Sequence, residues 1–211
     1  DQVNAMSSKQ IVENIKVGWN LGNSLDSHDT NSSDTETGWG NPKTTQQMID
    51  TVKAAGFNAV RIPVTWGEHM AADGTIDAAW MSRVKEVVDY AYNDGLYVIL
   101  NVHHDDELWL VPTKDKLESD KATLTTIWKQ ICATFQDYDH RLIFEGMNET
   151  RVIGSAEEWT GGTQESYDVI NQLFQAFVDT VRASGGSNTD RTVIVTDYAQ
   201  SAEKNAIGGM I

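Results

Sequence analysis

Five short apolar segments alternate with segments of helical periodicity along the 211 residues of the chain. The apolar segments are nearly continuous and rich in β-branched residues, which is typical of parallel strands buried on both faces. They comprise residues 15–23, 58–66, 96–104, 142–149 and 192–200. Because a helical segment separates each strand from the next, the pattern predicts an α/β fold with a parallel sheet.

Four segments between these strands repeat apolar residues at the spacing of one helix face. These stripes run through residues 48–55, 80–91, 124–135 and 170–181. Thr44 and Gln47 have the spacing of a capping box ahead of the first helix, and Gly56 follows its end. Trp80 and Trp128 fall on the apolar stripes, so we expect both side chains in the core.

Polar residues stand at the end of every predicted strand. They are Asn20 and Asn23, Arg61, His103 and His104, Asn148 and Glu149, and Asp197 and Tyr198. The first strand lacks the G-x-G-x-x-G loop of a nucleotide-binding open sheet. In a barrel, by contrast, all these strand ends would meet at one rim, where barrel enzymes hold their active sites. We therefore predict that residues 1–211 supply about the first five βα units of a single (β/α)8 TIM barrel, and that strands 6–8 are not in this chain.

Charge and composition exclude several classes of partner. The net charge of −15 disfavours a nucleic acid, which needs a basic face. No apolar run approaches 18 residues, so we expect no membrane-spanning helix. The single cysteine, Cys132, excludes an internal disulfide and is expected to be a small buried hydrophobe.

Glu149 offers a carboxyl group at the expected mouth of the barrel, where it can act as a general acid. Asn148 beside it can donate a hydrogen bond to a substrate hydroxyl. The alternative is that Glu149 caps a following helix. Arg61 stands inside an otherwise apolar strand, so we expect a carboxylate partner for it, either in a purely structural pair or orienting a catalytic carboxylate.

The segment HHDDE, residues 103–107, gathers groups that could bind a metal ion. Adjacent residues of an extended segment point in opposite directions, however, so His103 and His104 are not expected to share one ion. Two carboxyl groups flanking a sugar–sugar bond are what glycoside hydrolysis ordinarily needs, and Glu149 could be one of them. We predict no metal and no cofactor, and expect both imidazoles to hydrogen-bond sugar hydroxyls and catalytic carboxyls. Indole faces in strand-to-helix loops can stack on sugar rings or simply pack the loops; the candidates are Trp39, Trp66 and Trp109.

Several stretches together resemble glycoside hydrolase family 5, the cellulase A family of retaining barrel glycosidases. They are GWNLGNSLD, GWGNPKTT, AAGFNAVRIPVTW, YVILNVHHDD and LIFEGMNE, and their wording is most similar to subfamily 4. The resemblance spans most of residues 15–150. The family's usual Asn-Glu-Pro reads Asn148-Glu149-Thr150 here, a departure that follows the catalytic position.

The resemblance implies a role for each matching residue. Glu149 would be the acid/base, with Asn148 as its usual neighbour. Arg61 would support the nucleophile, and His103 would lie near the catalytic pair. Substrate binding on the glycone side would fall to Asn23 and His104. Beside the resemblance, the residues themselves make Tyr198 at the rim and the three loop tryptophans further candidates for substrate binding. The family's nucleophile is a glutamate on strand 7, which would lie outside this chain.

The expected function is that of a retaining endo-β-1,4-glucanase acting on cellulose, mixed-linkage glucan or xyloglucan. Mannan- or xylan-directed hydrolysis is one alternative; a catalytically inactive glycan-binding half-barrel and a metal-dependent hydrolase are others. We expect an extracellular enzyme whose signal peptide is absent from this sequence. Because five strands cannot close an eight-stranded barrel, we also expect a companion polypeptide or a swapped copy to complete it, and no activity from this segment alone.

Overall fold

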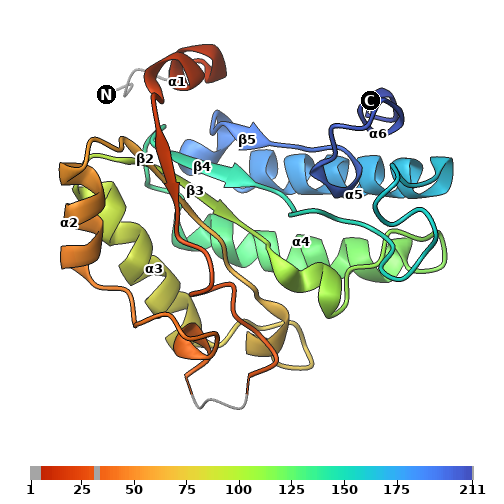
Figure 1. Ribbon diagram of the computed structural model, residues 1–211, viewed down its shortest axis with the longest axis horizontal. Coiled ribbons are helices and arrows are strands. Elements are labelled where there is room, and N and C mark those ends of the chain that lie inside the picture. Colours follow the sequence, from red (N-terminus) through yellow and green to blue (C-terminus); the bar gives the residue numbers. More distant parts are fainter. Residues whose placement is uncertain (1–5, 31–33, 211) are drawn as a thin grey trace.

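The computed structural model describes residues 6–30 and 34–210. Within them, five strands form one parallel sheet in the order β1-β2-β3-β4-β5 (Figure 1). Their bounds are Gly18–Asn20 for β1, Ala59–Ile62 for β2, Tyr97–Asn101 for β3, Leu142–Glu145 for β4 and Val193–Ile194 for β5. A doubly wound sheet reverses its strand order beside the first strand, whereas consecutive strands of a barrel do not. The sequential order therefore confirms the predicted barrel-type α/β fold.

The strands are shorter than the apolar segments that predicted them. Asn23, His103 and Glu149 lie in loops that follow the strands, whereas Asn20 and Arg61 are paired with each other within the ladder of β1 and β2. The outer strands are the shortest and least covered, since all of β1 is exposed and β5 is half-buried.

The helices alternate with the strands along the chain. The α-helices are α1 (Ser8–Asn14), α2 (Gln46–Ala54), α3 (Ala78–Asn93), α4 (Leu117–Thr134), α5 (Gln164–Ala183) and α6 (Lys204–Gly208). Short 3₁₀ helices span Thr35–Thr37, Gly67–His69, His104–Glu107, Gly186–Thr189 and Tyr198–Gln200. In Figure 1, α2 and α3 lie side by side at one end of the sheet and α4 and α5 at the other, and each pair is in contact. No α-helix of the described residues is long and apolar enough to cross a membrane.

Aromatic side chains fill the space between the sheet and its helices. Trp128 on α4 lies with its ring centroid 5.1 Å from that of Phe144 on β4 and 4.6 Å from that of Phe177 on α5. Burying a large apolar side chain contributes roughly 1.5–3 kcal/mol. Trp80 and Cys132 are buried as well, so their predicted core positions are confirmed.

The N-cap of α2 is one residue later than predicted. Thr45, not Thr44, accepts a hydrogen bond from the backbone N–H of Met48. Thr44 instead donates its backbone N–H to Glu36 at 2.9 Å, which draws it out of the capping position. The predicted stop at Gly56 is confirmed by its left-handed backbone, with φ +99°.

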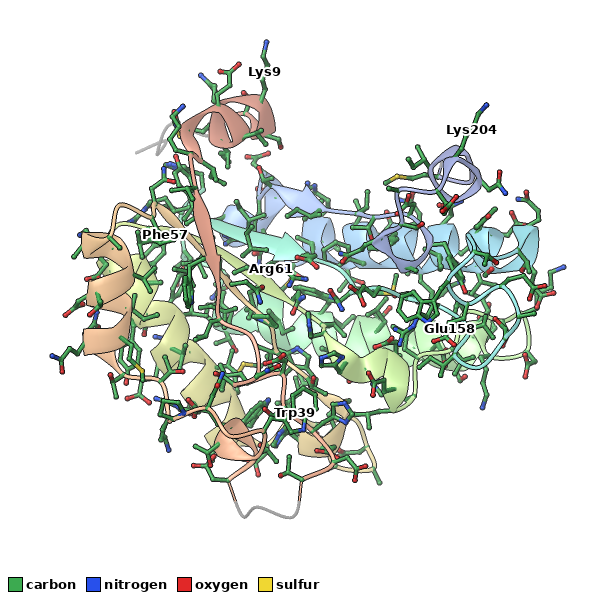
Figure 2. All side chains as sticks on the ribbon, viewed as in Figure 1. Lys9, Trp39, Phe57, Arg61, Glu158 and Lys204 are labelled. Carbon is green, nitrogen blue, oxygen red and sulfur yellow. The ribbon has the colours of Figure 1, made fainter. Side chains whose placement is uncertain are left out.

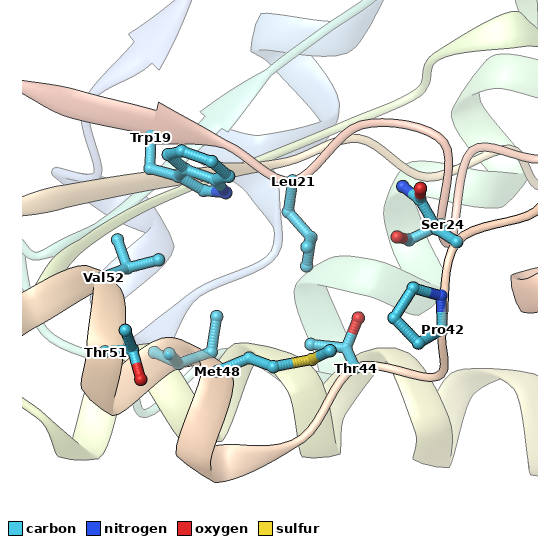
Figure 3. A pocket seen from close by; sticks show the side chains of 10 residues that line it. Trp19, Leu21, Ser24, Pro42, Thr44, Met48, Thr51 and Val52 are labelled. Atoms are coloured by element: carbon cyan, nitrogen blue, oxygen red, sulfur yellow. The ribbon is translucent and has the colours of Figure 1, made fainter.

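A cavity of about 360 Å³ opens between β1 and α2 (Figure 3). Trp19 and Leu21 line it from the strand side, and Met48 and Val52 from the helix side. Among the described residues β1 pairs only with β2, and β5 only with β4. The cavity therefore lies at an edge of the sheet where no further strand of the described chain is paired.

Candidate active site

Glu149 lies three residues beyond Gly146, the first residue after β4. All of β4 is buried, and a Cβ at Gly146 would come within 2.7 Å of Phe177 and 2.9 Å of Phe174. Glycine here lets the strand end pack directly against α5. Glu149 is half-buried and adopts φ +44°, a conformation that is uncommon outside glycine.

The capping role considered for Glu149 is wrong. The next helix in the described chain, α5, begins at Gln164, and its cap is Thr163. The chain between them forms turns, so Glu149 has no adjacent helix whose N–H groups it could accept from. Its carboxyl group therefore does not cap a helix.

Arg61 binds a carboxylate, as its sequence context predicted, and the partner is Glu145. The guanidinium donates from Nε to Oε2 at 2.8 Å and from Nη2 to Oε1 at 2.6 Å. The same Nη2 donates to Oδ1 of Asn148 at 2.8 Å, while Nη1 donates to Oδ1 of Asn20 at 3.0 Å. Figure 2 shows Arg61 near the middle of the sheet. One side chain thus ties the ends of β1, β2 and β4 together.

Asn101, the last residue of β3, determines which nitrogen of His103 carries the proton. Its Oδ1 accepts from the backbone N–H of Val64 at 3.1 Å, so its Nδ2 faces His103 Nδ1 at 2.9 Å. An amide nitrogen only donates, so Nδ1 is the acceptor and Nε2 carries the hydrogen. Burial, together with the charges of His104 and Arg61, lowers the pKa of His103 to about 2. His103 is therefore a neutral imidazole with one N–H to donate.

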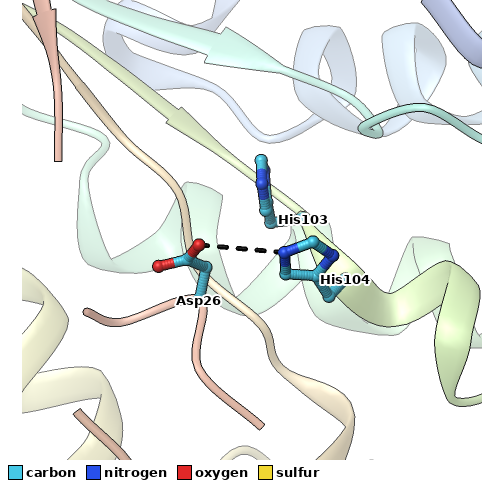
Figure 4. Close-up of side chains that lie close together, drawn as sticks. All are labelled: Asp26, His103 and His104. Atoms are coloured by element: carbon cyan, nitrogen blue, oxygen red, sulfur yellow. Dashed lines mark ion pairs between the residues drawn. The ribbon is translucent and has the colours of Figure 1, made fainter. Parts of the chain in front are cut away.

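His103 and His104 lie against each other, contrary to the expectation that they point apart. Their ring centroids are 4.5 Å apart with the planes at 82° (Figure 4). The expectation failed because the segment is not extended: β3 ends at Asn101, and a 3₁₀ helix begins at His104. Burial lowers the pKa of His104, while Glu107 and Asp26 act in the opposite direction.

Two groups of side chains among the described residues have the spacing to hold a metal ion. One is Asp26, His103 and His104, and the other is His28, His104 and Glu107. The sequence suggested a metal site only from adjacent residues within the segment HHDDE. Asp26 and His28, from the loop after β1, were missed because the predicted rim brings strand ends together without specifying which side chains of the long loops face one another.

The three tryptophans and the one tyrosine that were predicted to contact the substrate lie in different environments. Trp39 is 39% exposed and donates its indole N–H to the carbonyl of His28 at 3.1 Å, and Figure 2 labels it. Trp109 is half-buried and donates to Asp105 at 2.7 Å. Trp66 has no exposed surface and Tyr198 only 2%. Both predictions of substrate contact for Trp66 and Tyr198 are therefore wrong.

The physical reason differs between these two residues. The indole of Trp66 turns inward and donates to the carbonyl of Asn101 at 2.9 Å, so it packs the core between β2 and β3. Tyr198 lies under Gly162, and its hydroxyl accepts from the N–H of Val152 at 3.3 Å. Asn23, by contrast, is exposed in the loop after β1, with φ +58°.

Two buried carboxylates bind the loops that form the rim. Asp105 is fully buried and accepts from the N–H groups of Trp66 at 3.0 Å and Gly67 at 2.8 Å, besides the indole of Trp109. Burial raises the pKa of Asp105 to about 6 against the effect of these donors. Asp106 pairs with Arg151, and burial raises the pKa of Asp106 to about 7. Asp105 thus fastens the loop after β3 to the loop after β2.

Residues 24–208 match the family described as cellulase (glycosyl hydrolase family 5). The chain belongs to this family. Among its relatives, endoglucanase A of Ruminococcus albus is 48% identical over 98% of this chain, which spans 57% of that protein. Endoglucanase A of Clostridium longisporum is also 48% identical, over 95% of this chain and 40% of its own length. The resemblance seen in the sequence is therefore confirmed.

Solved structures of the same family superimpose closely on the chain. A GH5-4 broad specificity endoglucanase from Ruminococcus champanellensis with bound cellotriose gives a TM-score of 0.96 at 45% identity, covering 100% of this chain and 63% of that one. XEG5A, a GH5 xyloglucan-specific endo-beta-1,4-glucanase from a metagenomic library in complex with cellotriose, gives 0.93 at 48% identity, covering 96% and 61%. The chain thus has the fold of roughly the first three fifths of these family 5 structures.

Proposed function

We propose that this chain is part of the catalytic domain of a retaining endo-β-1,4-glucanase acting on cellulose, mixed-linkage glucan or xyloglucan. The observation that carries the proposal is the placement of Glu149 beside Asn148, with Asn148 fixed by Arg61 and no helix for Glu149 to cap. Membership in family 5 and the endoglucanase names of the relatives support the same substrate class.

In this proposal Glu149 protonates the glycosidic oxygen while a second carboxylate attacks the anomeric carbon. Glu149 then removes a proton from the water that releases the covalent intermediate. The second carboxylate is the family's strand 7 glutamate, which we place outside this chain. The proposed assignment of Arg61 as support for that nucleophile fits its position between Glu145 and Asn148.

The neighbours of Glu149 present hydrogen-bond donors of known orientation. Because Oδ1 of Asn148 accepts from Arg61, its amide NH₂ is the group left to donate to a sugar hydroxyl. His103 donates through Nε2, since Nδ1 is taken by Asn101. We place the glycone-side subsite at Asn23, His104 and Trp39, where an accessible indole lies 5.4 Å from the His104 ring.

We propose that strands 6–8 of the barrel come from outside these residues, from a longer polypeptide, a companion chain or a swapped copy. Two observations support this: within residues 6–30 and 34–210 no strand pairs with the outer side of β1 or β5, and the chain covers about three fifths of the solved relatives. We also propose that the enzyme acts outside the cell, because a polymeric glucan cannot enter it.

Glu149→Gln in the full-length protein tests the proposal. Turnover on an unactivated soluble glucan should fall by roughly 10²- to 10⁴-fold. Turnover of an aryl glucoside should fall much less, because its leaving group departs without being protonated. Glu157→Gln changes an exposed carboxyl group in the same loop region and should leave both rates unchanged. Near-normal glucan turnover by Glu149→Gln would remove this residue from the mechanism.

Further measurements on the unaltered protein separate the alternatives. Release of reducing ends would exclude an inactive glycan-binding half-barrel, whereas saturable binding without release would favour it. Loss of turnover with a chelator would favour a metal-dependent hydrolase. Rates on glucan, mannan and xylan compared side by side decide the specificity.

A further inference from the structure

His28 is a buried imidazole without a hydrogen-bond partner among the described residues. It is 7% exposed, and neither Nδ1 nor Nε2 makes a hydrogen bond. Nε2 lies 3.4 Å from Oε2 of Glu107, within ion-pair distance but not aligned for a hydrogen bond. Buried polar groups in native structures are normally satisfied, so an unpaired one calls for a ligand. A metal ion satisfies a bare imidazole nitrogen directly.

The groups around His28 have the spacing of a metal site. Glu107 lies between two imidazoles, with Oε2 at 3.4 Å from His28 Nε2 and Oε1 at 3.4 Å from His104 Nδ1. Ligands held about 2.0–2.1 Å from a tetrahedral zinc ion are themselves about 3.3 Å apart. The ligand atoms of all three residues lie within 4.8 Å of one another. Small side-chain rotations would therefore bring them onto one ion.

An outer carboxylate lies close to one of these ligands. With Nδ1 of His104 turned to Glu107, its Nε2 faces Oδ2 of Asp26 at 3.8 Å (Figure 4). Asp26 is 2% exposed and is held by the N–H of Ser24 at 2.8 Å. A carboxylate behind the second nitrogen of a ligating histidine is a common feature of zinc sites.

We propose that His28, His104 and Glu107 form a binding site for a divalent transition-metal ion of the zinc class. Two imidazoles and one carboxylate suit zinc, whereas calcium and magnesium prefer oxygen ligands alone. Three protein ligands leave the fourth position open to water. The site shares His104 with the proposed glycone-side subsite and lies beside Trp39, whose ring centroid is 5.2 Å from that of His28. A bound ion supplies no step of the proposed hydrolysis, but it would take Nδ1 of His104 away from the glycone-side subsite.

Zinc binding to the full-length protein, without an affinity tag, tests the proposal. Isothermal titration with Zn²⁺ should show one site in this domain, and Co²⁺ in its place should give the visible absorption of a four-coordinate complex. His28→Ala and Glu107→Gln should each weaken Zn²⁺ binding at least tenfold. His140→Ala removes a histidine outside the cluster and should leave the Zn²⁺ affinity unchanged.

Loss of Zn²⁺ binding through misfolding can be told apart from loss of a ligand. Glu107 is 40% exposed, so its replacement by Gln should keep the melting temperature of the parent protein. Unchanged Zn²⁺ affinity in Glu107→Gln, or absence of stoichiometric binding to the parent, would overturn the site. The titration measures the metal directly, so its outcome does not depend on whether Glu149 is the catalytic acid.

Discussion

Arg61 on β2 reaches across β3 to hold Glu145 on β4 through two parallel hydrogen bonds. The carboxylate side chain is only 4% exposed and the guanidinium side chain 24%. Two further donors, from Asn101 at 3.3 Å and Gln200 at 3.2 Å, complete the surroundings of the carboxylate. The charge at the centre of the rim is therefore balanced within the sheet, and Asn148 takes its position from the balanced pair.

Arg61→Ala should destabilise the protein, because it leaves the buried carboxylate of Glu145 without its counter-charge. Breaking such a pair from one side typically costs about 3–5 kcal/mol. Adding Glu145→Gln should recover much of this loss, since the uncompensated charge is gone, but should not restore turnover. Chemical denaturation of the two single variants and the double variant measures the coupling. Additive losses in the double variant would show that the pair is not a unit.

Trp39→Ala and Trp66→Ala should have opposite consequences. Trp39 is 39% exposed, so its loss should weaken cello-oligosaccharide binding by roughly 0.5–1.5 kcal/mol with a small change in melting temperature. Trp66 is fully buried, so its loss should lower stability by about 3–5 kcal/mol. Oligosaccharide titration and thermal melting of both variants give the comparison. Equal oligosaccharide binding by Trp39→Ala and the parent would show that Trp39 only packs its loop.

Glu36 should make the stability depend on pH in the acid range. Burial acts to raise the pKa of Glu36, but hydrogen bonds from Arg83 and from the Thr44 N–H outweigh it and lower the pKa below the usual value of 4.5. A lowered pKa in the folded state means that the stabilisation is present above pH about 4.5 and is lost as the pH falls through the folded-state pKa.

Glu36→Gln should therefore flatten the fall in stability below that pH while lowering stability at pH 7 by roughly 1.5–3 kcal/mol. Denaturant melts at a series of pH values provide the measurement. Parallel pH curves for the variant and the parent would contradict the assignment to Glu36.

Gly146→Ala should destabilise the protein and disturb the chain that leads to Glu149. The added Cβ would meet the rings of Phe174 and Phe177 at less than 3.0 Å, and overpacking of this kind costs about 1–3 kcal/mol. Gly208→Ala is the matched control, because no atom lies within 4 Å of its added Cβ. A melting temperature for Gly146→Ala equal to that of Gly208→Ala would contradict this account of the glycine.

The periodicity of the sequence was sufficient to predict the alternation of strands and helices, because burial on both faces leaves a continuous apolar run for each strand. It also predicted that Arg61 has a carboxylate partner. The identity of that partner was missed, although Glu145 interrupts the apolar run of β4 as plainly as Arg61 interrupts that of β2. Opposite charges inside two buried strands of one sheet are a signal for a mutual pair, even with a strand between them.

The orientation of side chains in loops could not be predicted in the same way. Trp66 and Trp39 both follow apolar or glycine-rich segments, yet only the tertiary structure turns one indole to Asn101 and the other to the surface. His103 and His104 share a face because the chain turns directly after β3, and no local pattern announces the 3₁₀ helix there. Such placements depend on contacts between loops that are far apart in the sequence.

Left-handed backbone conformations gather at the ends of the strands, at Asn23 after β1, at Glu149 after β4 and at Ala199 and Gln200 after β5. Each non-glycine residue held there carries strain of roughly 1–3 kcal/mol, which the packed sheet below must sustain. Loops under such strain relax more easily than the strands that support them. On heating, the arrangement around Glu149 should therefore be lost before the sheet melts, and the proposed glucan turnover of the full-length protein should end several degrees below its unfolding transition.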